Sequence, residues 1–208
     1  MIAGQRAYSD AVRWLRAAGR HRPDPWDRAR RAFLYSLGAG LVIMALIAIV
    51  STSSFGLPGR SALRTGWPGA VLLGIAAVGT LVALMQREHI SWAISRAREP
   101  FVRRLSNEEN FESMADALSS CPAPFRTRFF IGWVLLPAAL WALGTILAFS
   151  SAYFVVDAII ARFSVNWLHP SFGVGDALVS YLAFRIGAPR AATWRLAVGA
   201  HRAAAGAY

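Results

Sequence analysis

The sequence predicts an all-α integral membrane protein, and three observations lead to that prediction. Of its 208 residues, 56% are hydrophobic and only 16% are charged, whereas a soluble domain carries about 25% charged residues. Three apolar stretches are each long enough to cross a hydrocarbon core, which takes about 20 helical residues. All 22 basic residues are arginine, and they leave a net charge of +11. High apolarity beside this charge favours a polytopic protein at an anionic lipid surface over a nucleic-acid-binding domain.

Residues 1–22 predict a basic amphipathic helix that lies in the headgroup layer. Arg6, Arg13, Arg16 and Arg20 fall on one arc of a helical wheel, while the opposite arc includes Ala11, Val12 and Leu15. A basic edge of this kind favours anionic lipid phosphates. Alternatively, the apolar face docks on a partner subunit or on the middle loop of this protein. We expect seven arginines to contact lipid headgroups: Arg6, Arg13, Arg16, Arg20, Arg28, Arg30 and Arg31.

Three segments are expected to cross the bilayer. Residues 25–54 predict a helix that enters the first transmembrane span, since Asp24 can cap it and Pro25 suits a first helical position. A short external loop, residues 55–66, leads to the second span, residues 67–85. The third span, residues 129–161, is longer than a bilayer requires. We expect a kink near Pro137, because proline cannot donate to the carbonyl of Trp133.

A fourth segment, residues 172–188, is less apolar because it contains Asp176 and Arg185. On a helical wheel its small and polar residues form one stripe, which suits close helix packing in lipid. The stripe consists of Gly173, Asp176, Ser180, Ala183 and Gly187. Hydropathy alone favours three spans. The arginine distribution favours four, because a fourth span would place the basic tail, residues 189–208, in the cytoplasm. Since the stripe and the arginines both support it, we expect residues 172–188 to form a fourth, weaker span.

Orientation follows from the arginines that flank the spans. Eight lie in the first thirty-one residues and seven between residues 87 and 128, but only two lie between the first and second spans. The positive-inside rule therefore places the N-terminus and the middle loop, residues 86–128, in the cytoplasm.

The middle loop is expected to contain helices over about 86–99 and 107–119. The second of these has an apolar stripe, Phe111, Met114 and Leu118, and an acidic side. The apolar stripe could receive a partner protein. Alternatively, the acidic side folds back onto the N-terminal arginines, or the helix rests solvated on the membrane surface.

The sequence offers little catalytic chemistry. The single cysteine, Cys121, excludes an internal disulfide and cysteine-based metal cages. The four histidines have no helical spacing that would hold a metal, and Glu88 and His89 are the nearest approach to an acid–base pair. We therefore expect no catalytic residue, metal or cofactor. Asp157 and Asp176 are a candidate intramembrane polar pair, because ionisable groups within a bilayer mark functional sites.

These features predict a non-enzymatic accessory, assembly or scaffold subunit of a larger complex in a bacterial cytoplasmic membrane. The expected partners are anionic lipids, and other membrane subunits or further copies of this chain, but not nucleic acid. One alternative is a small transporter or channel subunit that uses Asp157, Asp176 and Arg185. The other, with the least support, is a lipid-acting enzyme at the membrane interface that uses Glu88 and His89.

Overall fold

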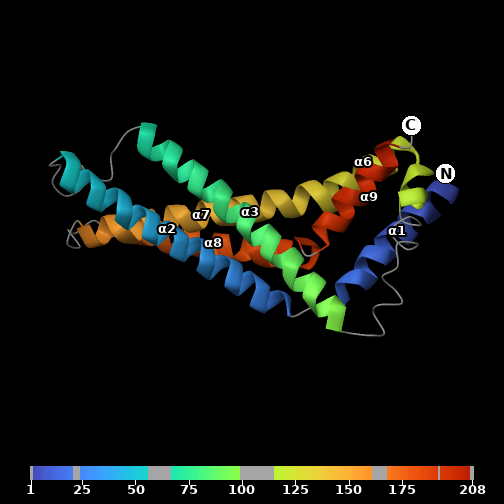
Figure 1. Cartoon of the computed structure of the whole chain (residues 1–208), viewed down its shortest axis with the longest axis horizontal. Helices are drawn as coiled ribbons and strands as arrows, with labels where there is room; N and C mark the ends of the chain where they lie inside the picture. The colour runs from blue at the N-terminus through green and yellow to red at the C-terminus, as the bar shows by residue number, and fades with distance from the viewer. Residues whose placement is uncertain are drawn as a thin grey trace. The chain divides into compact units, whose positions relative to one another are not determined.

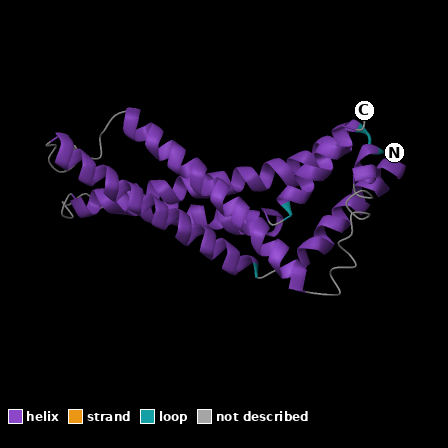
Figure 2. Cartoon of the chain, viewed as in Figure 1, coloured by secondary structure: helices purple, strands orange, loops and turns teal. Residues whose placement is uncertain are grey.

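The computed structural model describes residues 2–20, 24–55, 67–98, 115–160, 168–191 and 193–206. Every element in these ranges is a helix, so the all-α prediction is confirmed for them (Figure 2). In chain order (Figure 1), the elements are α1 (Ile2–Arg20), α2 (Pro25–Phe55), α3 (Trp67–Arg98), α6 (Ala123–Phe129), η2 (Phe130–Leu135), α7 (Leu136–Ile160), α8 (Leu168–Ala191) and α9 (Trp194–Gly206).

Two helical stretches of the described chain are long and apolar enough to cross a membrane. They are Pro25–Ile49, within α2, and Ala123–Ile159, which runs from α6 into α7. The apolar part of α3, Val71–Arg87, is shorter. Two candidate membrane-spanning helices are therefore present, and the number of crossings beyond these two stays a prediction.

The helix boundaries largely follow the sequence signals. Helix α2 begins at Pro25 and has Asp27 in its first turn, where a carboxylate favours the positive end of the helix dipole. The expected cytoplasmic helix over 86–99 is a continuation of α3 to Arg98. Of the expected helix over 107–119, residues 115–119 are described and are helical. The loop over 55–66 lies almost wholly outside the described residues.

A π-helical segment, η2, precedes the proline at which a kink was expected. The backbone N–H of Leu136 donates to the carbonyl of Ile131, five residues earlier. Pro137 comes next and has no N–H to donate, so the regular α-helical ladder cannot continue through it. The proline thus coincides with a local widening of the helix, which is one recognised cause of helix bending.

The chain divides into two compact units, each built from separate segments. Unit 1 comprises 1–25, 85–139 and 187–208, and unit 2 comprises 26–84 and 140–186. The chain therefore leaves unit 1 twice and returns to it twice. Its first passage through unit 2 contains α2 and most of α3, and its second contains most of α7 and α8.

Within unit 2, α8 runs antiparallel to both α2 and α7. Going along α2, Trp26 lies beside Arg185 and Phe33 beside Tyr181, so the α8 numbers fall as the α2 numbers rise. Along α7, Trp141 contacts Phe184 and Phe154 contacts Phe172, in the same reversed order. The contacts with α7 extend from Phe172 to Phe184 of α8, whereas those with α2 lie at Tyr181 and Arg185.

Unit 1 has one hydrophobic core that joins distant parts of the sequence. Helix α1 contributes three residues, the middle loop one, the α6–η2 stretch three and α9 three. They are Ala11, Val12, Leu15, Leu118, Phe129, Trp133, Val134, Ala197, Ala200 and Ala204. The first and last helices of the described chain therefore share a core.

Candidate functional site

The helices of unit 2 expose many large apolar side chains and bury several small ones, although Trp141 and Phe184 are also fully buried. On α8, Val174 and Leu178 are 62% and 61% exposed, whereas Ser180 is fully buried. On α2, Val42 is 61% exposed and Ser36 is fully buried. On α7, Ile146 is 58% exposed whereas Thr145 is 1% exposed. A soluble core would show the reverse, because burial of large apolar groups is its main driving force. This inverted pattern suits an apolar solvent.

Glycines give the closest helix approaches in unit 2. A Cβ atom at Gly40 of α2 would lie 2.9 Å from the Ala152 Cβ and 3.3 Å from the Phe149 Cα of α7. At Gly144 of α7 it would meet the Phe184 ring of α8 at 3.0 Å. By contrast, Gly74 and Gly79 of α3 and Gly132 of η2 have no described atom within 4 Å of a built Cβ. Only part of the glycines in the apolar stretches therefore serve helix packing within the chain.

Hydroxyl groups on α7 and α8 form hydrogen bonds that hold helices together. The Oγ of Ser180 donates to the carbonyl oxygen of Gly144 at 2.6 Å, across the α7–α8 contact. The Oγ of Ser150 donates to Oδ2 of Asp176, also at 2.6 Å. Thr145 donates within its own helix to the carbonyl of Trp141 at 2.9 Å. These polar side chains therefore have structural partners.

Asp157 and Asp176, the candidate polar pair, have different surroundings. Asp176 is half-buried and accepts the Ser150 bond, whereas Asp157 is only 5% exposed. Ser150 lies seven residues before Asp157, which is about 10 Å along a helix axis. The register of α7 on α8 therefore separates the two carboxylates by about that distance along the helices, and the described contacts do not bring them together.

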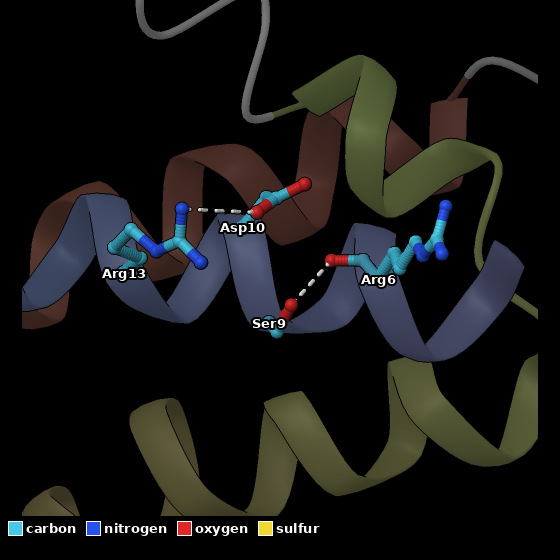
Figure 3. Close-up of polar contacts among 4 residues, drawn as sticks. All are labelled: Arg6, Ser9, Asp10 and Arg13. Carbon is cyan, nitrogen blue, oxygen red and sulfur yellow. Dashed lines mark hydrogen bonds and ion pairs between the residues drawn. The ribbon is translucent and has the colours of Figure 1, made fainter. Parts of the chain in front are cut away.

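Three of the expected headgroup arginines on α1, Arg6, Arg13 and Arg16, are exposed. Figure 3 shows Arg6 and Arg13 on this helix. Nη1 of Arg13 lies 3.8 Å from Oδ1 of Asp10, in an ion pair whose side chains are both more than half exposed. Ser9 donates to the backbone carbonyl of Arg6, and this bond leaves the Arg6 guanidinium unconstrained. The side chain of Arg20 lies outside the described part.

The three arginines at the start of α2 differ from one another. Arg28 is only 4% exposed, whereas Arg30 and Arg31 are exposed. Arg31 donates through Nε to the backbone carbonyl of Asp27 at 3.2 Å. Arg28 is thus the one arginine of the expected headgroup set whose described side chain is buried in protein.

The apolar face of α1 is covered by protein in unit 1. Ala11 and Leu15 are buried against Leu118 of the middle loop and Ala197 of α9, among others. Docking on the middle loop was one of the two alternatives for this face, and the structure has that contact together with a second one to α9. The interfacial position of α1 stays a prediction, and it now depends on the arginine edge alone.

The expected docking stripe of the middle loop is only partly described. Leu118 is 1% exposed and belongs to the unit 1 core. Phe111 and Met114 lie outside the described residues. The one described member of the stripe therefore packs inside the chain.

Cys121 lies at a close contact between α1 and the start of α6. Its Sγ lies 3.2 Å from the carbonyl oxygen of Ala117 and 3.7 Å from that of Gly4, and the single S–H donates to one of these two acceptors at a time. A Cβ at Gly4 would lie 2.5 Å from Cδ of Pro122, so only glycine fits there without a shift. Burial raises the pKa of the Cys121 thiol above its ordinary value, and the positive charge of Arg126 opposes that shift. The thiol therefore stays protonated at neutral pH.

Two features were missed at the sequence level. The tail over 189–208 contains helix α9, and the spacing of Ala197, Ala200 and Ala204 was the signal for a helix with one small apolar face. The second feature is a stack of the Arg185 guanidinium on the Trp26 ring, with Cζ 3.3 Å from the ring centroid. No sequence pattern could pair these residues, because they are 159 positions apart.

Metal-binding and acid–base chemistry have little support in the described residues. Within them, no group of three or more histidine, cysteine or acidic side chains could hold a metal ion. The side chains of Glu88 and His89 lie outside the described part. No family model, curated protein or solved structure matches this chain.

Proposed function

We propose that this chain is a non-enzymatic, polytopic subunit of a larger complex in a bacterial cytoplasmic membrane, with its apolar helices in the bilayer and with α1, the middle loop and the tail on the cytoplasmic side. The observation that carries the proposal is the inverted burial of unit 2. Its exposed residues include Val42 and Leu46 on α2, Ile146 on α7 and Val174 on α8, each more than half exposed. Lipid tails or the apolar faces of other subunits would cover such a surface at no cost.

Four crossings of the membrane agree best with the alternation of the chain between unit 1 and unit 2. Helices α1 and α9 share the unit 1 core, so the two lie on the same side of any membrane that unit 2 spans. An even number of crossings is then required, and α2 and α7 each need a returning helix. Helix α3 returns the chain at Met85 and α8 returns it at Gly187. The 24 residues of α8 extend about 36 Å, enough for a hydrocarbon core of about 30 Å.

The charge distribution supports a cytoplasmic unit 1. Its three segments contain most of the arginines, and α1 exposes Arg6, Arg13 and Arg16. Cytoplasmic segments next to spans carry an excess of arginine, and anionic lipid adds attraction for each such charge. The exposed arginines of α1 would bind anionic headgroups on the cytoplasmic side of the membrane.

Helix α3 supports a role in a complex. Its apolar residues Ile75 and Val78 are 65% and 61% exposed. Gly79 and Ala83, four positions apart, are also exposed, and no described atom lies within 4 Å of a Cβ built at Gly79. Small residues at this spacing let a second helix approach closely in lipid. Helix α3 thus has both the apolar surface and the small-residue groove that a partner subunit would use.

Purification in a mild detergent, followed by mass spectrometry, tests the proposal. We expect the full chain to co-purify with other membrane proteins or with further copies of itself. Replacing Gly79 with leucine should reduce that co-purification. Gly38→Leu is the matched control, because Gly38 also has no described atom near its built Cβ but lies on α2. A monodisperse wild-type monomer without partners would contradict the proposal.

A small transporter or channel subunit is the second candidate, and the burial of Asp157 favours it. Ionisable groups within membrane-spanning helices are rare and mark candidate functional sites, and Asp157 is 5% exposed in a helix of unit 2. Ion or proton flux into liposomes that contain the purified chain, abolished by Asp157→Asn, would support this candidate.

A further inference from the structure

The start of α2 and the end of α8 meet in unit 2 through an arginine and a tryptophan. The Cζ atom of Arg185 lies 3.3 Å from the centroid of the Trp26 ring. Trp26 is 47% exposed and Arg185 is exposed. A contact this short fixes the flat face of the guanidinium on the face of the indole, so the arginine is held in one orientation.

A guanidinium stacked by its face keeps its hydrogen-bond donors free in its own plane. Arginine has five N–H donors in a planar fork that matches the oxygens of a phosphate. Among the described residues, the stack on Trp26 is the one contact that Arg185 makes. The donors of an oriented arginine are therefore available to a ligand.

A second arginine lies on the same face of α2. Arg30 is exposed and follows Trp26 by four residues, so the two are neighbours on the helix surface. Asp27 is the acidic residue of this turn, and its backbone carbonyl accepts a bond from Arg31. Asp24, two residues before Trp26, adds a second carboxylate, so Arg30, Arg31 and Arg185 leave a smaller positive local charge.

The position of the stack relates it to lipid. One residue beyond Arg185, Ile186 is 61% exposed, and Leu182 and Leu178 continue the exposed apolar face of α8. Tryptophan is enriched at the boundary between apolar and polar membrane layers. Oriented cationic donors at the edge of an apolar face suit the phosphate of an anionic phospholipid better than a phosphate in solution.

We propose that Arg185, stacked on Trp26 and assisted by Arg30, binds the phosphate group of an anionic phospholipid at the membrane interface. This Trp26–Arg185 site rests on the proposed membrane insertion of unit 2. It differs from the general attraction of the α1 arginines, because one lipid phosphate would be held in a defined geometry.

The test counts bound lipids on the full-length protein by native mass spectrometry in mild detergent. The probes are dioleoyl phosphatidylglycerol, dioleoyl phosphatidylcholine and inorganic phosphate. We expect Arg185→Gln to weaken phosphatidylglycerol binding about tenfold, the equivalent of one charge-assisted hydrogen bond. Arg185→Lys should give an intermediate loss, because it keeps the charge but loses the planar fork. Arg202→Gln, an exposed arginine of α9, is the matched control and should bind as the wild type does.

Three outcomes decide the proposal. Equal phosphatidylglycerol binding by the Arg185→Gln and Arg202→Gln proteins would overturn the site. Displacement of the lipid by submillimolar inorganic phosphate would assign the same donors to free phosphate and overturn the lipid. Trp26→Leu should weaken binding while the unfolding temperature stays unchanged, and full binding by that variant would overturn the role of the stack. A wild-type chain absent from the membrane fraction would instead contradict the proposed function.

Discussion

Gly40 sets how closely α2 and α7 approach in unit 2. A Cβ at this position would meet both a side-chain carbon of Ala152 and the backbone of Phe149. Backbone cannot move aside as a flexible side chain can, so a larger residue here must push the helices apart. Gly38, two residues earlier on the same helix, has no such neighbour.

Gly40→Leu should therefore destabilise unit 2, whereas Gly38→Leu should not. Overpacking of this kind costs about 1–3 kcal/mol. Thermal unfolding of the purified full chain in detergent measures the difference. Equal unfolding temperatures for the two variants would show that the α2–α7 contact is not close.

The buried thiol of Cys121 gives a second prediction at the residue scale. Maleimide should label it at least about tenfold more slowly in the folded protein than in denaturant, because labelling must wait for local opening. Because burial raises the pKa of the thiol, the folded state keeps a proton that the unfolded state releases above about pH 8.5. Stability should therefore fall as the pH rises through that value. Cys121→Ala should remove this part of the pH dependence, and rapid labelling of the native protein would contradict the burial.

Helix α1 shows what an amphipathic pattern can and cannot predict. The helical wheel of residues 1–22 predicts that the apolar face with Ala11, Val12 and Leu15 is buried. It does not say whether lipid or protein buries that face. In the structure the cover is protein, in part from α9. Local periodicity cannot predict a contact between residues nearly two hundred positions apart. The stack of Arg185 on Trp26 could not be predicted for the same reason.

Leu15→Ala should loosen α1 from the unit 1 core. Leu15 is 1% exposed, and truncation of a buried leucine costs about 2–5 kcal/mol. The backbone amides of α1 should then exchange hydrogen at least about tenfold faster, as hydrogen exchange with mass spectrometry can measure. Arg16→Ala changes the exposed neighbour and serves as the control. Unchanged exchange in Leu15→Ala would mean that α1 is held by something other than this core.

Helix α8 is the element that the sequence predicted best. Of its stripe, Gly173, Ser180, Ala183 and Gly187 are buried and Asp176 is half-buried, so the expected packing face is confirmed. Small residues at helical spacing predict a contact face from local sequence alone. The register on α7, which pairs Asp176 with Ser150 and leaves Asp157 about two turns away, depends on shape matching between two helices and could not be predicted.

At the scale of the whole molecule, the two passages of the chain through unit 2 predict its topology. Reporter fusions after Arg20 and after Gly206 should both give cytoplasmic signal, because α1 and α9 share one core. Fusions within the segments before Trp67 and before Leu168 should give signal from the opposite side. A periplasmic signal at Gly206 would mean an odd number of crossings and would contradict the shared core in the membrane-inserted protein.

Because the core of unit 1 combines the first and last described helices, it can be completed only at the end of synthesis. Its core draws on Ala11 near the beginning of the chain and on Ala204 near its end. At about 5–20 residues per second, a ribosome needs about 10–40 s to translate the stretch between them. During that interval both passages through unit 2 are synthesised while α1 still lacks α9. A truncated chain would never bury its first helix fully, so quality-control proteases could distinguish finished from unfinished copies by that uncovered face alone.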